Sequence, residues 1–311
     1  MPIRPYAALV LTLALAACGR DNAESTAVTA TPPAAPAPVA TPPATPETPP
    51  AAAPQARAPA TDLDTILAGD WRDPVNVARD VWRHPKETLT FFGVTPDQRV
   101  LEISPGRGWY TEILVPLLRE RGHYVGAIAD PAAAPDERTR DYYAKSNADL
   151  RAKLAARETV YGAPELREID SARPDFGPPG SIDTVLTFRN VHNWLMAGHA
   201  EAMFKGFYEV LKPGGVLGVV EHRAAGEVPA GDKSGYVGQD QVIALAKAAG
   251  FEFEASSEIN ANPADTKDHE AGVWSLPPSL RLGDKNREKY LAIGESDRMT
   301  LRFRKPATPA P

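Results

Sequence analysis

From about residue 99 onward, short apolar runs alternate with longer stretches in which apolar residues recur every three or four positions. Runs such as 99–104 and 182–188 have the length of buried strands, and the amphipathic stretches predict helices. The predicted strands are 99–104, 124–129, 166–169, 182–188, 216–220, 251–256 and 299–304, and the helices between them are 109–121, 136–158, 199–211 and 240–249. This alternation predicts an α/β fold with a mostly parallel sheet and helices on both faces.

Two segments fall outside this alternation. Asp73-Pro74 is a typical helix start, and it predicts a helix to about residue 83 and a second short helix from 85 to 93, within a helical cap over 61–95. Residues 257–298 separate the last two strands and are rich in Pro, Asp and Gly. An insertion of this length predicts an active-site flap.

The amino terminus has the pattern of a targeting segment. Residues 7–17 form an apolar run that is too short to cross a bilayer but suits a signal peptide. The run ends at Cys18, the chain's single cysteine. Residues 1–18 thus resemble a bacterial lipoprotein signal, which implies that the Cys18 thiol receives a lipid. The alternative is an ordinary signal peptide with an incidental cysteine.

Residues 19–60 have the composition of a disordered linker. From 27 to 60, 29 of 34 residues are Ala, Pro or Thr, which leaves too little apolar side chain for a core. We therefore expect a folded domain over 61–311, tethered by lipid to a bacterial envelope membrane and facing the periplasm. Gly19 after the cysteine favours the outer membrane. If the signal is misread, the chain works in the cytosol.

Charge and cysteine content exclude several functions. The net charge of −6 lies in 61–311, because three basic and three acidic side chains cancel before that segment. Such a surface does not attract phosphate backbones, so no nucleic-acid partner is expected. A domain without cysteine has no disulfide, thiolate zinc site or cysteine-ligated cluster. Composition leaves the oligomeric state open.

A glycine turn joins the first strand to the helix that follows it. Gly106 and Gly108 allow backbone N–H groups to approach a ligand closely, and Glu102 lies near the strand's end. A plain tight turn explains two such glycines equally well. A dinucleotide fingerprint requires a small residue where Thr111 stands, so NAD is disfavoured.

Together with the Lys-Pro-Gly-Gly sequence at 212–215, this turn resembles motifs of class I S-adenosylmethionine (SAM)-dependent methyltransferases. The segments ISPGRGWYTEIL (103–114), LTFRNVHNW (186–194), VVEHR (219–223) and AIGESDRMT (292–300) are similar to a family of bacterial methyltransferases that are often exported. The resemblance covers nearly all of 70–305. It implies a Rossmann-like class I methyltransferase fold with a seven-stranded, mostly parallel sheet, helices on both faces and an antiparallel last strand, and it implies SAM as cofactor.

The resemblance also implies cofactor-binding residues. They are Glu102 for the ammonium group, Gly106 and Gly108 along the methionyl part, Asp130 for the ribose, Asp170 for the adenine end, and Arg189 and Asn190 after the fourth strand. Ser104 stands where this family of folds usually has a glycine, and it narrows the space beside the methionyl part. Alternatively, Asp130 only caps the turn at Pro131 and Asp170 is a loop residue.

The candidate catalytic residues follow the fourth and fifth strands. His192 is the expected general base, with Glu221 and His222 facing the same crevice, because the carboxyl ends of adjacent parallel strands converge. Alternatively, His192 holds its loop, and the other two support the end of the sheet.

Other side chains have residue types that suit a site. Trp109, Tyr110 and Trp194 can line a pocket for a sulfonium or an acceptor, or they can belong to the core. Asp265, Asp268 and His269 in the insertion are metal-ligand types, but loops of this composition are usually solvated, and we expect no metal.

The sequence therefore predicts an enzyme that transfers a methyl group from SAM to an unidentified small molecule or envelope component. SAM is made in the cytosol, which argues against methyl transfer by an exported chain. The alternative is a membrane-tethered, non-catalytic ligand-binding module with the same fold.

Overall fold

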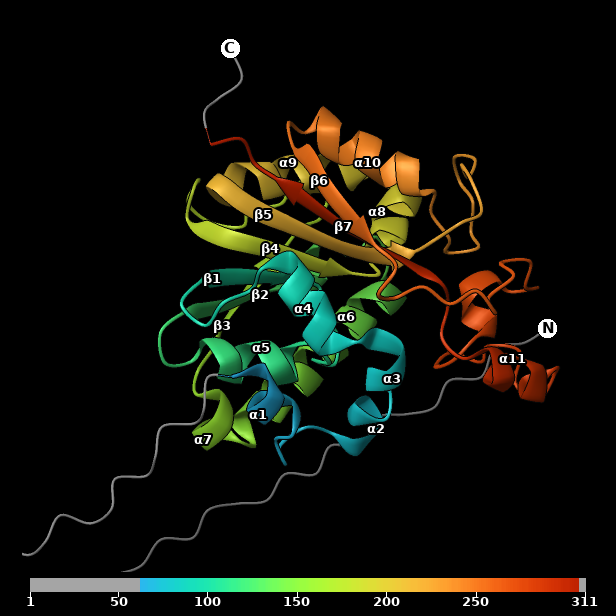
Figure 1. Ribbon diagram of the computed structural model, residues 1–311, viewed down its shortest axis with the longest axis horizontal. Coiled ribbons are helices and arrows are strands. Elements are labelled where there is room, and N and C mark those ends of the chain that lie inside the picture. Colours follow the sequence, from blue (N-terminus) through green and yellow to red (C-terminus); the bar gives the residue numbers. More distant parts are fainter. Residues whose placement is uncertain (1–61, 308–311) are drawn as a thin grey trace, which may run out of the picture. The chain divides into compact units, whose positions relative to one another are not determined.

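The computed structural model of the protein describes residues 62–307. The predicted signal peptide, Cys18 and the linker lie outside the described residues. The described part forms one sheet with helices packed around it (Figure 1). Among these residues, no helix has both the length and the apolar character needed to span a membrane.

The sheet has seven strands in the order β3-β2-β1-β4-β5-β7-β6. The strands are β1 (Arg99–Ile103), β2 (His123–Ala129), β3 (Glu165–Ile169), β4 (Ile182–Phe188), β5 (Leu211–His222), β6 (Glu252–Ser257) and β7 (Arg298–Arg304). Strands β3, β2, β1, β4 and β5 pair in parallel, whereas β7 lies antiparallel between β5 and β6. This topology confirms the predicted Rossmann-like methyltransferase fold, including its antiparallel last strand.

Helices cover both faces of the sheet, as predicted. They are α1 (Leu63–Leu67), α2 (Pro74–Val77), α3 (Asp80–Arg83), α4 (Pro85–Phe92), α5 (Thr111–Leu118), α6 (Glu137–Ala155), α7 (Glu158–Tyr161), α8 (Val191–Ala197), α9 (Ala200–Val210), α10 (Gln239–Ala248) and α11 (Arg287–Ile293), with short 3₁₀ turns at Pro131–Ala133 and Gly272–Ser275. One core cluster packs α8, α9 and α10 on the sheet, and the other packs α1, α4, α5 and α6 on the opposite face.

Local signals explain several helix ends. The Asp73 side chain accepts a hydrogen bond from the Val75 N–H, with Pro74 in the first turn of α2, as the sequence predicts. The predicted helix from 74 to 83 is instead two short helices, α2 and α3. Gly93 ends α4 with a φ of 72°, a backbone conformation that glycine adopts without strain.

Two elements differ from the sequence prediction around strands β4 and β5. Helix α8 lies where the sequence predicts a loop between the strand 182–188 and the helix 199–211. Strand β5 begins five residues before the predicted 216, because Leu211 pairs with Ile182 of β4 through an irregular register. The first difference is important for function, because it places His192 on a helix.

Candidate functional site

The turn after β1 approaches a ligand position with its backbone. Ser104 has a φ of 50°, a left-handed conformation that favours glycine, and its N–H donates to the carbonyl of Ala127 on β2. Gly106 also has a positive φ, and a Cβ added there would meet nothing within 4 Å. At Gly108 an added Cβ would lie 2.9 Å from the Leu150 side chain. Gly106 therefore faces open space, whereas Gly108 allows α6 to pack closely.

A cavity of about 1270 Å³ lies at the carboxyl ends of the parallel strands. Five of the predicted cofactor residues line it: Ser104, Gly106, Asp130, Asp170 and Asn190. Its volume exceeds the range of about 300–1,000 Å³ that is common for small-molecule sites. The structure thus brings these five residues to one concave surface, in the crevice where ligands of α/β sheets bind.

The two aspartates in the cavity each use part of their carboxylate on a local turn. Asp130 Oδ1 accepts from the Ala132 N–H at 2.8 Å, and Asp170 Oδ1 accepts from the Ala172 N–H at 2.8 Å. Arg173 Nε approaches the second oxygen of Asp170 at 3.3 Å. Each aspartate therefore caps a turn, but this does not exclude ligand binding, because a carboxylate accepts several hydrogen bonds.

Asn190 connects two strand ends beside the cavity. Its side-chain amide donates to the Ile103 carbonyl of β1 at 3.0 Å and to the Thr187 hydroxyl of β4 at 3.2 Å. These bonds orient the side chain, so that its amide oxygen remains available to a ligand.

Glu102 does not line the cavity but lies buried below the glycine turn, 2% exposed. Its Oε2 accepts hydrogen bonds from the hydroxyls of Tyr124 at 2.7 Å and Thr111 at 2.8 Å, whereas Oε1 has no partner among residues 62–307. Burial raises the pKa of Glu102 to about 7, although both hydroxyls favour the ionised form. The folded protein thus holds a carboxyl group that is poised to gain or lose a proton near neutral pH.

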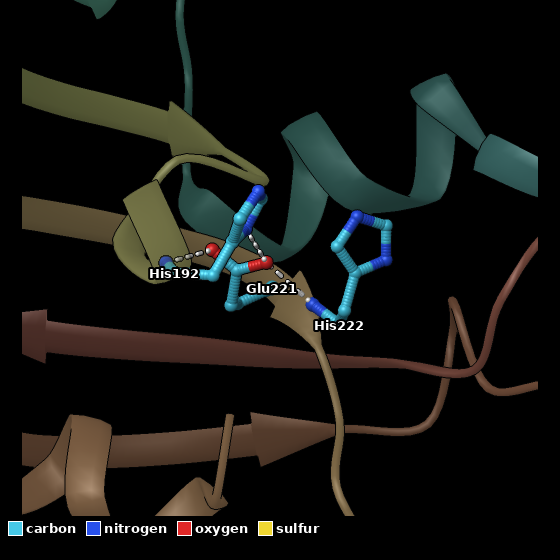
Figure 2. A group of neighbouring side chains, drawn as sticks. All are labelled: His192, Glu221 and His222. Atoms are coloured by element: carbon cyan, nitrogen blue, oxygen red, sulfur yellow. Dashed lines mark hydrogen bonds and ion pairs between the residues drawn. The ribbon is translucent and has the colours of Figure 1, made fainter. Parts of the chain in front are cut away.

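His192 at the start of α8 and Glu221 near the end of β5 form a buried hydrogen-bonded pair (Figure 2). His192 Nδ1 donates to Glu221 Oε1 at 3.0 Å, and the His192 backbone N–H donates to Oε2 at 3.2 Å. A carboxylate that holds Nδ1–H leaves Nε2 as the proton acceptor, and Nε2 has no hydrogen-bond partner within 62–307. This is the arrangement of a general base with an orienting carboxylate.

His222 lies beside this pair, with its ring centroid 5.3 Å from that of His192. Its backbone N–H donates to Glu221 Oε1 at 2.7 Å, and its Nδ1 lies 2.5 Å from the hydroxyl of Ser296. Burial, followed by the charges of His192 and Arg189, lowers the pKa of His222 well below its ordinary value. The structure thus brings the three predicted catalytic side chains together, with His222 as a neutral neighbour.

The same three side chains can offer ligands to a metal ion, because their donor atoms all lie within 4.8 Å of one another. However, the Glu221 carboxylate already accepts hydrogen bonds from two backbone N–H groups and from His192 Nδ1. Metal binding would break at least one of them. We therefore favour the proton-transfer arrangement.

Residues of the insertion contact this group directly. The Trp274 ring contacts the His192 ring edge to face, with 6.1 Å between the ring centroids, and Ser296 hydrogen-bonds to His222. The predicted flap thus reaches the candidate catalytic side chains.

The other candidates lie elsewhere. Arg189 does not line the cavity but lies near Glu295, and Tyr110 stacks on Phe188 in the core. Trp109 packs against Arg83 and donates to the Asn76 carbonyl, so it anchors the helical cap to the glycine turn that precedes α5. Of the three predicted aromatic candidates, Trp194 alone lines the cavity.

The acidic and histidine side chains of the insertion form a structural network. Asp265 is 2% exposed and accepts hydrogen bonds from Tyr236, from His269 Nε2 and from the Asp297 N–H. Asp268 is exposed and bonds to Thr266. Asp265 therefore holds the insertion together.

Sequence reasoning missed several lining residues. Tyr142, Tyr143, Ser146 and Asn147 of α6 face the cavity, as do Ser171 and His199, whose side chains lie 2.8 Å apart. Tyr142 is 69% exposed. The signal that could have revealed them is a pair of tyrosines in an otherwise polar helix.

Comparison with known proteins identifies the fold. No family model and no curated protein matches the chain. A SAM-dependent methyltransferase from Aquifex aeolicus superposes with a TM-score of 0.50 and 13% identity, covering 78% of this chain and 98% of that one. The cyclase SpnF superposes with a TM-score of 0.53 and 17% identity, covering 77% and 86%. At such identities the likeness shows the fold alone, and that fold is the Rossmann-like methyltransferase fold.

Proposed function

We propose that the chain is a SAM-dependent methyltransferase whose acceptor binds beside His192. One observation carries the proposal. The cavity at the strand ends is lined by Gly106, Asn190 and Asn193. His192, which does not itself line it, lies between the last two in the chain and hydrogen-bonds to the buried Glu221. A ligand cavity next to an oriented base is the arrangement that a group-transfer site requires.

The residues present suit the cofactor. Gly106 leaves open space where a side chain would stand, so a ligand can lie against the backbone. Asp130, which lines the cavity, has a second carboxylate oxygen, Oδ2, without a partner among the described residues, so it can accept from a ligand hydroxyl. When bound, SAM supplies a methyl group attached to a positively charged sulfur, and this sulfur is the leaving group when a nucleophile takes up the methyl group.

The protein's own part is to position the acceptor and to take up its proton. His192 Nε2 would accept the proton that the acceptor's nucleophilic atom releases when it is methylated. Glu221 stabilises the imidazolium that forms and keeps the ring in the required tautomer. Trp274 covers the ring and limits access of water.

Calorimetric titration of SAM and S-adenosylhomocysteine into the full-length chain tests the proposal. We expect binding in the micromolar range that Gly106→Asp abolishes, because the added side chain projects into the cavity. Gly180→Asp is the matched control. Gly180 has a φ of 65° against 58° at Gly106, and an added Cβ there also meets nothing within 4 Å, but it does not line the cavity.

If neither ligand binds, or if both variants behave alike, the proposal is wrong. If SAM binds, labelled methyl transfer from SAM to cell extract identifies acceptor fractions, and His192→Gln should remove the transfer while SAM binding remains.

A second candidate is a ligand-binding module that does not transfer methyl groups. The left-handed Ser104 narrows the turn where glycine is favoured. Tight binding of SAM without any labelled product would favour this candidate.

We further propose that the chain is an envelope lipoprotein, lipidated on Cys18 and facing the periplasm. The apolar run before Cys18 and the Ala/Pro/Thr-rich linker after it support this location. A cytosolic enzyme is the alternative, and it has direct access to SAM.

A further inference from the structure

Four arginines gather around one carboxylate next to the candidate catalytic group. This arginine cluster consists of Arg79 before α3, Arg83 at the end of α3, Arg189 directly after β4, and Arg298 at the start of β7. Glu295 accepts from Arg79 at 2.6 Å, from Arg83 at 3.2 Å and from Arg298 at 3.0 Å. The cap, the sheet and the insertion therefore meet at a single acidic side chain.

The cluster carries more positive than negative charge. Burial by itself would raise the pKa of Glu295, but the surrounding arginines outweigh burial and hold the pKa at about 2, so the carboxylate is ionised. Nearby acids have other partners, since Asp297 pairs with Arg223 and Lys267, and Glu221 with His192. One carboxylate thus faces four guanidinium groups.

Several donors of the cluster lack a partner. Arg83 is 2% exposed and Arg298 is 1% exposed, yet Arg83 Nη1 and Arg298 Nε have no hydrogen-bond partner among residues 62–307. The Arg189 guanidinium forms neither an ion pair nor a hydrogen bond with any side chain or backbone group among residues 62–307. Buried donors without partners cost free energy, and charged ones cost most.

Ion pairing that only holds the fold together does not explain why Arg189 lies in this cluster. Burial lowers the pKa of Arg83 most, and repulsion by Arg189 lowers it further. Glu295 raises this pKa, but its effect is smaller than that of Arg189. Arg189 also has a φ of 63°, a left-handed conformation that is unusual for arginine. An unpaired, strained cation that repels its neighbour destabilises the protein unless a further anion joins the cluster.

The cluster lies next to the proposed base. Arg189 is three residues before His192, and Arg298 is the register partner of His222 across β5 and β7. Arg79 and Arg189 are partly exposed, so an ion can reach the cluster from solution.

We propose that the arginine cluster binds an oxyanion group, a carboxylate or a phosphate, of the molecule whose other end lies at His192. Guanidinium groups bind such oxyanions in bidentate fashion. This inference rests on the proposed function only in naming that molecule as the methyl acceptor; the oxyanion site itself does not depend on SAM.

Thermal unfolding of the full-length chain tests the oxyanion site with two probes, inorganic phosphate and acetate, each against chloride at equal ionic strength. At tenfold excess over the dissociation constant, we expect Tm to rise by about 3 to 6 °C with at least one probe. A response to phosphate alone supports a phosphorylated ligand, and a response to acetate supports a carboxylate.

Variants separate the site from general salt effects. Arg189→Gln should lose at least half of the rise, and Arg189→Lys, which keeps the charge, should retain most of it. Arg304→Gln is the control, because Arg304 pairs with Glu254 at the other end of β7. Equal rises in all four proteins, or no rise in any of them, would overturn the inference.

The SAM titration of the wild-type chain distinguishes the two proposals. If SAM does not bind but the anion response depends on Arg189, the proposed function fails and the oxyanion site stands. If SAM binds and there is no anion response, this inference alone fails.

Discussion

Glu102 is a carboxyl group whose ionisation the fold opposes. In the folded protein it keeps its proton up to about pH 7, whereas in the unfolded chain it releases the proton near its ordinary pKa of 4.5. Its stabilising contribution is therefore complete below the unfolded value and is lost as pH rises towards the folded value. The loss amounts to at most about 3 kcal/mol.

We therefore predict that Glu102→Gln flattens the pH dependence of stability. Urea unfolding at about pH 5.5 and about pH 8 should show a smaller decrease in the free energy of unfolding for the variant than for the wild type. Glu165→Gln on β3 is the control, because the Glu165 pKa is lowered and the group titrates below this range. Equal slopes for wild type and Glu102→Gln would show that Glu102 is already ionised at the lower pH.

Glu221 is the side chain that fastens α8 to β5. It is fully buried and accepts hydrogen bonds from His192 Nδ1 and from the N–H groups of His192 and His222. All of these groups are donors. The side-chain amide of a glutamine at this position would place its NH₂ donor opposite one of them, and no hydrogen bond could form there.

The prediction for Glu221→Gln is a loss of about 1 to 3 kcal/mol in the free energy of unfolding, the cost of an unsatisfied buried donor. Glu221 does not line the cavity, so calorimetry should show SAM binding unchanged while labelled methyl transfer falls. Unchanged transfer would contradict the role of His192 as an oriented base.

At the scale of elements, the helical cap and the insertion pack closely against each other at Gly294. An added Cβ there would lie 2.3 Å from the Trp82 ring, and the glycine has a φ of 83°. Arg298 Nη2 donates to the Trp82 carbonyl close by, and Glu295 follows Gly294 directly. This contact therefore also positions the arginine cluster.

Gly294→Ala should destabilise the protein more than Gly283→Ala does. Gly283 lies in the same insertion with a φ of 61°, but an added Cβ there meets nothing within 4 Å. Left-handed strain, about 1 kcal/mol, is common to both variants, whereas overpacking against Trp82 adds about 1 to 3 kcal/mol to the first. Chemical denaturation measures both, and equal losses would show that the cap can shift away from the insertion at little cost.

At the scale of the whole molecule, three parts of the chain complete one site. The sheet supplies the cavity and Glu221, the cap supplies Arg79 and Arg83, and the insertion supplies Trp274 and Glu295. The site thus depends on contacts between segments that are far apart in the sequence.

The proposed membrane anchor also belongs to this scale. In bacteria grown with labelled palmitate, the wild-type chain should carry label and sediment with membranes, and Cys18→Ser should lose the label and move to the soluble fraction. Label that persists in Cys18→Ser, or no label in the wild type, would favour the cytosolic alternative.

The sequence by itself determined the sheet, most of the helices that connect its strands and much of the cavity. Strand and helix periods are local, and the carboxyl ends of parallel strands meet at one edge, so residues such as Gly106, Asp130 and Asn190 had to converge once the alternation was recognised.

Only the tertiary structure decided which way individual side chains point and which distant segments meet. Glu102 turns to Tyr124 below the cavity, His192 lies on a helix, and Arg189 lies near Glu295 of the insertion. The cap and the insertion have no periodic pattern that places them on the sheet. Their positions follow from side-chain packing and buried charge, and these interactions exist only once the chain has folded.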